Sequence, residues 1–268
     1  MERGRFARAM FERRERKTGK RRLSTAHLIS RIFPYELTAD SSPLDAARTH
    51  IEDGYGVVIL YNHFSKSDHI RAAAVVVDEI EALRARRILS PVALHHYGTP
   101  VKLLGRYGRI ELQPVVTDDT RERFKEKSKE LPSREEAVEE AKKYKNIARE
   151  VLSEGGMIAI APQIGRRKTL GKPEGKVLRR FLEGYDSNRV VFLFVGLGIP
   201  ELTDYGQEDI KGYNVRKSFS VKFGRPMTRI QLEVEAGVRR INIDEMVFDQ
   251  LAKVVPPEYA SAGRASQT

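Results

Sequence analysis

The sequence predicts an α/β protein with a largely parallel central sheet flanked by helices, preceded by a basic N-terminal helical segment. The main observation is an alternation of short apolar runs with helical patterns from about residue 45 onward, in the order strand, helix, strand, strand, helix, strand, helix, strand. In addition, 268 residues, of which 40% are hydrophobic, suffice for a sizeable core. Glycine and proline are near their usual share, which argues against collagen-like and linker-like architectures.

The first strand is predicted at Val57 to Leu60, an unbroken apolar run. A helix follows at once, with Ser65 or Ser67 as its N-cap. Its apolar stripe consists of Ala72, Val76, Ile80 and Leu83.

A second long helix is predicted to begin at Ser133, because Ser133 and Glu136 have the spacing of a capping box, and to end at Gly155 and Gly156. Four more strands are predicted over residues 91–94, 109–115, 157–161 and 190–195. In such a sheet, ligands bind beyond the carboxyl ends of the strands.

Composition excludes several kinds of chemistry. The chain has no cysteine, so it has no disulfide, thiolate metal site or cysteine nucleophile. The longest charge-free stretch, Ile88 to Val101, is shorter than the roughly 20 apolar residues of a membrane span. The N-terminus does not have the pattern of a secretory signal. We therefore expect a location in the cytoplasm or at the cytoplasmic face of a membrane, without a transmembrane helix.

The positive charge is concentrated near the N-terminus. Residues 1–22 contain ten Lys or Arg and three Glu, a net charge of +7 out of +11 for the whole chain. We divide the chain into a basic amphipathic segment, 1–44, and an α/β domain, 45–265. The segment is either a solvated helix or a site for an anionic surface, which would be lipid or nucleic acid. Apolar residues from Phe6 to Phe33 favour lipid, whereas only Phe6 and Phe11 lie near the arginines for base stacking.

Two loops follow buried strands. Asn62 to Asp68 contains His63 and Asp68 in an H-x-x-x-x-D spacing, which suits a general base oriented by a carboxylate. The alternative is an ordinary strand-end histidine and a carboxylate favoured by the helix dipole. The second loop, Pro162 to Lys168, carries three consecutive cations that suit a phosphate or carboxylate, or that form a basic surface turn.

Six segments resemble the glycerolipid acyltransferases typified by 1-acylglycerol-3-phosphate O-acyltransferase. VVILYNHFSKSD (57–68) is similar to the first motif, N-H-x-S-x-x-D, and GMIAIAPQIGR (156–166) to the third, F-P-E-G-T-R. PVKLLGRYGRIELQPV (100–115) resembles the second motif and VFLFVGLGIP (191–200) the fourth. VKFGRP (221–226) and LAKVVPPEYASAG (251–263) resemble the closing segments. The resemblance covers roughly residues 45 to 263.

The resemblance implies an O-acyltransferase that moves a fatty acyl group from a coenzyme A or acyl carrier protein thioester to a hydroxyl of a lysophospholipid or related lipid. In the family's scheme His63 is the general base, Asp68 orients it, and Arg166 binds the acceptor phosphate. No cofactor or metal is implied, and the expected partners are the thioester, the lysolipid acceptor and an anionic membrane surface, with no nucleic acid. The remaining candidates for substrate binding are Asn62, Ser65, Arg106, Arg109 and Gln163.

Departures from the motifs leave alternatives open. Gln163 stands where the family has Glu, and the arginine position of the second motif falls on Pro114, for which Arg106 or Arg109 is the substitute. One alternative is therefore an inactive lipid-binding relative, and another is a nucleic-acid-binding protein acting through its basic arm. A metal shared by His69 with His95 and His96 is disfavoured, since adjacent strand residues point to opposite faces. Gly196 and Gly198 are too few for a dinucleotide loop.

Overall fold

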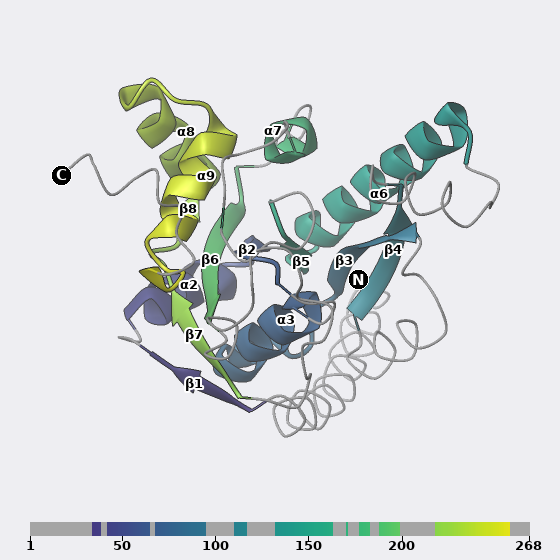
Figure 1. Cartoon of the computed structure of the whole chain (residues 1–268). Coiled ribbons are helices and arrows are strands. Elements are labelled where there is room, and N and C mark those ends of the chain that lie inside the picture. Colours follow the sequence, from purple (N-terminus) through teal and green to yellow (C-terminus); the bar gives the residue numbers. More distant parts are fainter. Residues whose placement is uncertain are drawn as a thin grey trace, which may run out of the picture.

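A computed structural model describes residues 34–38, 42–64, 68–94, 110–116, 132–162, 170, 177–182, 188–198 and 218–257. Within these residues the strands form one eight-stranded sheet in the order β1-β7-β6-β2-β5-β3-β4, with β8 also paired to β6 (Figure 1). The strands are β1 (Tyr35–Leu37), β2 (Gly56–Tyr61), β3 (Ile88–Ala93), β4 (Ile110–Val115), β5 (Met157–Ile160), β6 (Val190–Gly198), β7 (Phe219–Phe223) and β8 (Met227–Thr228).

Most strand pairs are parallel. The pairs β2 with β5, β2 with β6, β3 with β4, β3 with β5 and β1 with β7 are parallel, and only β6 with β7 and β6 with β8 are antiparallel within the described residues. The predicted α/β class with a largely parallel sheet is therefore confirmed. The predicted basic helical segment lies almost wholly outside the described residues.

Helices cover both faces of the sheet. Figure 1 shows α2 and α3 on one side and α6, α7, α8 and α9 on the other. The helices are α2 (Ser42–Glu52), α3 (Asp68–Glu79), the 3₁₀ helix η1 (Glu81–Leu83), α6 (Arg134–Ser153), α7 (Val177–Leu182), α8 (Arg229–Val238) and α9 (Ile243–Ala252). Both β1 and the start of α2 precede residue 45, and Leu44 of α2 belongs to the hydrophobic core.

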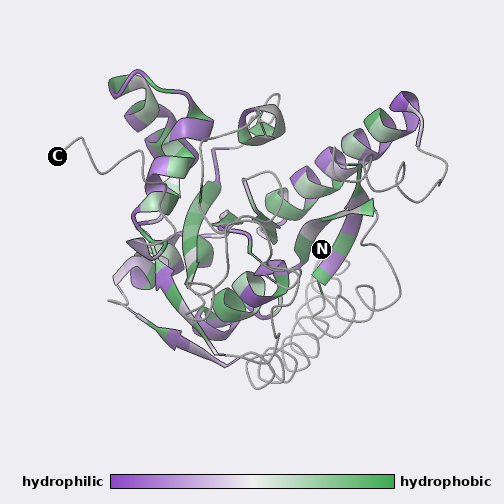
Figure 2. Ribbon diagram, viewed as in Figure 1, coloured by the Kyte–Doolittle hydropathy of each residue, from purple (hydrophilic) through white to green (hydrophobic). Residues whose placement is uncertain are grey.

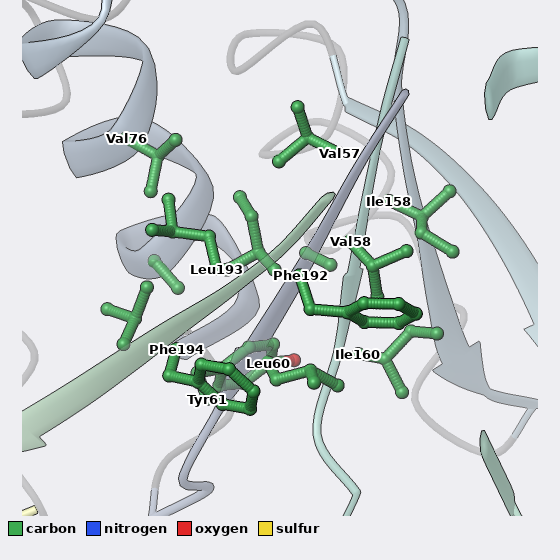
Figure 3. Packing of buried hydrophobic residues seen from close by; sticks show 14 of the residues in the cluster. Val57, Val58, Leu60, Tyr61, Val76, Ile158, Ile160, Phe192, Leu193 and Phe194 are labelled. Carbon is green, nitrogen blue, oxygen red and sulfur yellow. The ribbon is translucent and has the colours of Figure 1, made fainter. Parts of the chain in front are cut away.

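The core lies around β2, β5 and β6, whose residues are all buried. Their continuous apolar runs are typical of strands covered on both faces. Figure 3 shows these side chains packed together, with Val76 of α3 on the side of Leu193. The predicted stripe after β2 is buried throughout: Ala72 and Val76 lie in α3, Ile80 follows it, and Leu83 ends η1.

The long helix α6 begins and ends as predicted. The Ser133 hydroxyl accepts a hydrogen bond from the Glu136 backbone N–H, and the Glu136 carboxylate accepts one from the Ser133 N–H. The helix alternates hydrophilic and hydrophobic residues along its length (Figure 2) and buries Ala148, Val151 and Leu152. Just after its end, Gly155 has φ +72°, which a residue with a Cβ rarely adopts.

Arginines connect the elements at the amino edge of the sheet, where the parallel strands begin. The Arg86 guanidinium donates to the backbone carbonyls of Ile51 at 2.6 Å, Gly155 at 2.6 Å and Tyr55 at 3.3 Å. A Cβ on Gly155 would lie only 2.6 Å from Arg86 Nη1, so a side chain at this position would displace the guanidinium. The neighbouring Arg87 forms ion pairs with Glu111, Glu150 and Glu154.

Two glycines in β6 allow the C-terminal part of the domain to pack directly on the strand. A Cβ on Gly196 would lie 2.1 Å from the Val254 carbonyl oxygen, and one on Gly198 would lie 2.8 Å from Pro256 Cγ. This G-x-G pair therefore serves close packing at the carboxyl end of β6.

Candidate active site

The candidate site lies at the carboxyl ends of β2 and β5, which are adjacent in the sheet. The chain leaves β2 through α3 and leaves β5 toward α7, on the opposite side of the sheet (Figure 1). Adjacent strands whose connections diverge in this way form the switch point at which open α/β sheets bind ligands. Both loops selected from the sequence begin here, the first at Asn62 and the second at Pro162.

His63 and Asp68 are brought together at this switch point. His63 Nδ1 lies 3.4 Å from Asp68 Oδ2. The Asp68 side chain is fully buried and lies in the first turn of α3, where the helix dipole favours a carboxylate. Its Oδ2 also accepts a hydrogen bond from the Phe64 backbone N–H at 2.5 Å. The two residues of the H-x-x-x-x-D spacing therefore come together at the start of α3.

His63 is the accessible member of the pair. Its side chain is 24% exposed, and its ring is nearly perpendicular to the Tyr61 ring at a centroid distance of 6.2 Å. Burial raises the pKa of Tyr61 well above its usual value, and the nearby Asp68 charge raises it further. Tyr61 therefore stays neutral near pH 7, and its ring packs against His63.

A second histidine, His69, follows Asp68 in α3 and is buried. The pKa of His69 is lowered to about 4, chiefly by burial and also by the nearby His63, whereas Asp68 acts in the opposite direction. Its Nε2 is buried with no hydrogen-bond partner among the described residues. The sequence considers His69 only in a metal site shared with His95 and His96, and it disfavours that site. The part of the chain that the structure describes holds no cluster of three or more His, Asp or Glu suited to a metal.

Asn62, predicted as a substrate-binding residue, is 1% exposed. Its Nδ2 donates to the Leu197 carbonyl oxygen at 2.8 Å, and its Oδ1 accepts from the Leu197 N–H at 2.7 Å. The side-chain amide is therefore engaged with the backbone of β6.

The other predicted substrate-binding residues, Ser65, Arg106, Arg109, Gln163 and Arg166, lie outside the described residues. Pro114, which occupies the arginine position of the second motif, lies in β4 and pairs in register with Val92 of β3.

None of the helices in the described ranges is both long and apolar enough to cross a bilayer. No family model matches the sequence, and no curated protein is significantly similar to it.

Proposed function

We propose that this protein is an O-acyltransferase that moves a fatty acyl group from a thioester, acyl-CoA or acyl carrier protein, to a hydroxyl of a lysophospholipid or related lipid. The observation that carries the proposal is the pairing of a partly exposed His63 with a fully buried Asp68 at 3.4 Å, at the switch point of a parallel sheet. The likeness of the surrounding residues to the first acyltransferase motif selects acyl transfer among the reactions that such a pair supports.

In the proposed reaction, His63 Nδ1–H faces Asp68 and Nε2 accepts the proton of the acceptor hydroxyl. The resulting alkoxide oxygen attacks the thioester carbonyl carbon and forms a tetrahedral intermediate. Collapse of this intermediate breaks the C–S bond, and the imidazolium returns its proton to the leaving sulfur. An ester and a free thiol result, with no covalent enzyme intermediate.

Asp68 supports this cycle in two ways. It fixes the tautomer that leaves Nε2 free to accept a proton, and it stabilises the imidazolium formed in the middle of the reaction. Because Asp68 is fully buried and bonded to Phe64 N–H, its position is fixed before the substrate arrives.

Arg166 is proposed to bind an anionic acceptor, with Arg106 or Arg109 as further cations and Ser65 and Gln163 as polar contacts. Arginine pairs with phosphate through two hydrogen bonds at once. The proposed location is the cytoplasmic face of a membrane. The net charge of +7 over residues 1–22 and the apolar residues up to Phe33 support attraction to anionic lipid.

The function is tested by His63→Ala with a panel of acyl thioesters and lysolipids. We expect transfer to fall by about 10²- to 10⁴-fold, the usual contribution of a general base. The control is His50→Ala, which removes a histidine of α2 that packs against Tyr55 instead. An unchanged rate in His63→Ala, or an equal loss in His50→Ala, would contradict the mechanism.

The membrane location is tested by sedimentation with vesicles. We expect binding to anionic vesicles that weakens with salt, since the Debye length is about 8 Å at physiological ionic strength. Replacing Arg13, Arg14, Arg16 and Lys17 by Gln should reduce this binding and leave transfer to a soluble short-chain acceptor unchanged. Equal sedimentation of the neutralised variant would contradict the role of the basic segment.

A further inference from the structure

The N–H and C=O of Leu197 in β6 both point toward β2, beyond the residue at which β2 ends. The last registered pair of these strands is Tyr61 with Val195. Two residues further along β6, the Leu197 N–H and C=O bond to the side chain of Asn62 instead of to a backbone. The Asn62 side-chain amide thus supplies one donor and one acceptor to Leu197, in place of the backbone hydrogen bonds that a longer β2 would make.

This arrangement anchors the residue that directly precedes His63. The residue that directly follows it, Phe64, is anchored as well, because its N–H donates to Asp68 and its side chain is buried. His63 therefore lies between two anchored neighbours, one held to β6 and the other to α3. The backbone freedom of the general base is restricted from both sides, which reduces the entropy lost on reaching a reactive geometry.

The strand that holds Asn62 is itself tightly packed. Gly196 and Gly198 flank Leu197, and both lie against the segment Val254 to Pro256 so closely that a Cβ would collide with it. The partner of Asn62 is therefore a backbone with little room to move.

We propose that Asn62 is a positioning residue for His63, rather than a residue that contacts substrate. The expected effect on kcat rests on the proposed acyl transfer. The anchoring of Asn62 to Leu197 does not depend on any reaction. A positioning residue affects the turnover of bound substrates, whereas a substrate-binding residue affects their apparent affinity.

The experiment compares Asn62→Ala with Gln113→Ala in the full-length protein. Gln113 is a matched control, because it is also a buried amide and its Nε2 donates to Glu140 of α6 at 3.0 Å, far along the sheet from His63. We expect Asn62→Ala to lower kcat by about 10- to 100-fold, the scale of a displaced catalytic group, with each KM within about twofold. Gln113→Ala should keep both constants within about twofold of the parent.

Asn62→Asp provides a conservative step, because it keeps the shape and the acceptor for Leu197 N–H but loses the donor to Leu197 C=O. We expect its kcat to lie between those of the parent and Asn62→Ala. A raised KM with unchanged kcat in Asn62→Ala would overturn the proposal in favour of substrate binding. A similar fall of kcat in Gln113→Ala would also overturn the proposal, because general destabilisation would then explain the effect of Asn62→Ala.

A second measurement does not need activity. Amide hydrogen exchange should show loss of protection at Leu197 in Asn62→Ala, and unchanged protection there in Gln113→Ala. Retained protection at Leu197 would overturn the anchoring itself. If the parent transfers no acyl group at all, the proposed function fails, and the exchange at Leu197 still decides whether Asn62 anchors the strand end. If Asn62→Ala does not fold, the same exchange measurement and kcat on Asn62→Asp decide the proposal.

Discussion

The Asp68 carboxylate is fully buried, lies 3.4 Å from His63 Nδ1 and accepts a hydrogen bond from the Phe64 N–H, so its negative charge acts directly on these groups. Asp68→Asn keeps the size of the side chain, but its amide donor can face His63 Nδ1 and then favours the tautomer with the proton on Nε2. We expect kcat to fall by about 10²- to 10⁴-fold with a well-folded protein.

The measurement is kcat together with the thermal midpoint of unfolding. Asp45→Asn is the matched control, since Asp45 is also an acidic residue in the first turn of a helix but is 58% exposed and pairs with Arg48. If Asp45→Asn lowers kcat by the same factor, the loss of any carboxylate at the start of a helix would explain the effect, and the specific role of Asp68 would be contradicted.

His69 predicts a pH dependence of stability. Its pKa is lowered to about 4 in the folded protein, chiefly by burial, so the unfolded state binds the proton first as pH falls. The associated stability is complete above the unfolded pKa of about 6.5 and is lost as pH falls from 6.5 to 4. Between pH 7 and 5 this one group should account for about 2 kcal/mol of lost unfolding free energy.

Urea unfolding of the parent and of His69→Gln at pH 7 and pH 5 measures this dependence. The variant should lose less stability between the two pH values than the parent does, whatever its absolute stability. The two titratable groups that act on His69, His63 and Asp68, are retained in both proteins. Parallel losses in parent and variant would show that His69 is not the group responsible.

At the scale of elements, two glycines should respond in opposite ways to an added methyl group. Gly237 lies in α8, and a Cβ added there would meet no atom within 4 Å, so Gly237→Ala should stabilise the protein by about 0.5 to 1 kcal/mol. Gly196→Ala should destabilise it by about 1 to 3 kcal/mol, because the new Cβ would collide with the backbone of Val254. Chemical denaturation of both variants checks the signs, and a neutral Gly196→Ala would show that the segment after α9 can move away from β6.

The elements that the sequence predicted best are those with complete local signals. The start of α6 depends on two residues three positions apart, and β2 is an uninterrupted apolar run. By contrast, β1 has only three residues and is defined by its pairing with β7, far away in the chain, so no local pattern indicates it. The apolar run predicts the end of β6 at Val195, whereas pairing with β7 continues through Gly198, past glycines that lower strand propensity.

The same distinction applies to the site. His63 and Asp68 are five residues apart, and one strand-to-helix turn brings them together, so their proximity could be predicted. The partner of Asn62 is 135 residues away and is a backbone group, which leaves no mark in the sequence. His69 has no local signal either, because its burial follows from the packing of α3 as a whole and the sequence disfavours a metal role for it.

For the molecule as a whole, Arg86 joins the end of α2 and the residue before β2 to Gly155, which follows α6 and is about 100 residues away. Arg86→Ala would leave the carbonyls of Ile51, Tyr55 and Gly155 without this donor, and we expect a loss of about 2 to 4 kcal/mol in unfolding free energy. Arg225→Ala, which removes an exposed ion pair with Glu235, should change it by less than about 1 kcal/mol.

Among the folded molecules of Arg86→Ala, acyl transfer per molecule should remain close to the parent value, because Arg86 lies at the edge of the sheet opposite His63. Denaturant titration and active-site kinetics on the same preparation check both parts. A reduced kcat at full occupancy of the folded state would show that the amino edge influences the site.

The arginine contacts at the amino edge also bear on how such a protein changes over generations. They join α2, α6 and β4 to the residues just before β2 and β3, whereas the loops Asn62–Asp68 and Pro162–Lys168 begin at the opposite, carboxyl ends of the strands. We therefore expect replacements in those loops to leave these stabilising contacts intact, including replacements that change the acceptor of the proposed reaction. Residues around His63 and Asp68 can therefore be exchanged without loss of the fold, and the proposed reaction can change its acceptor while the sheet stays the same.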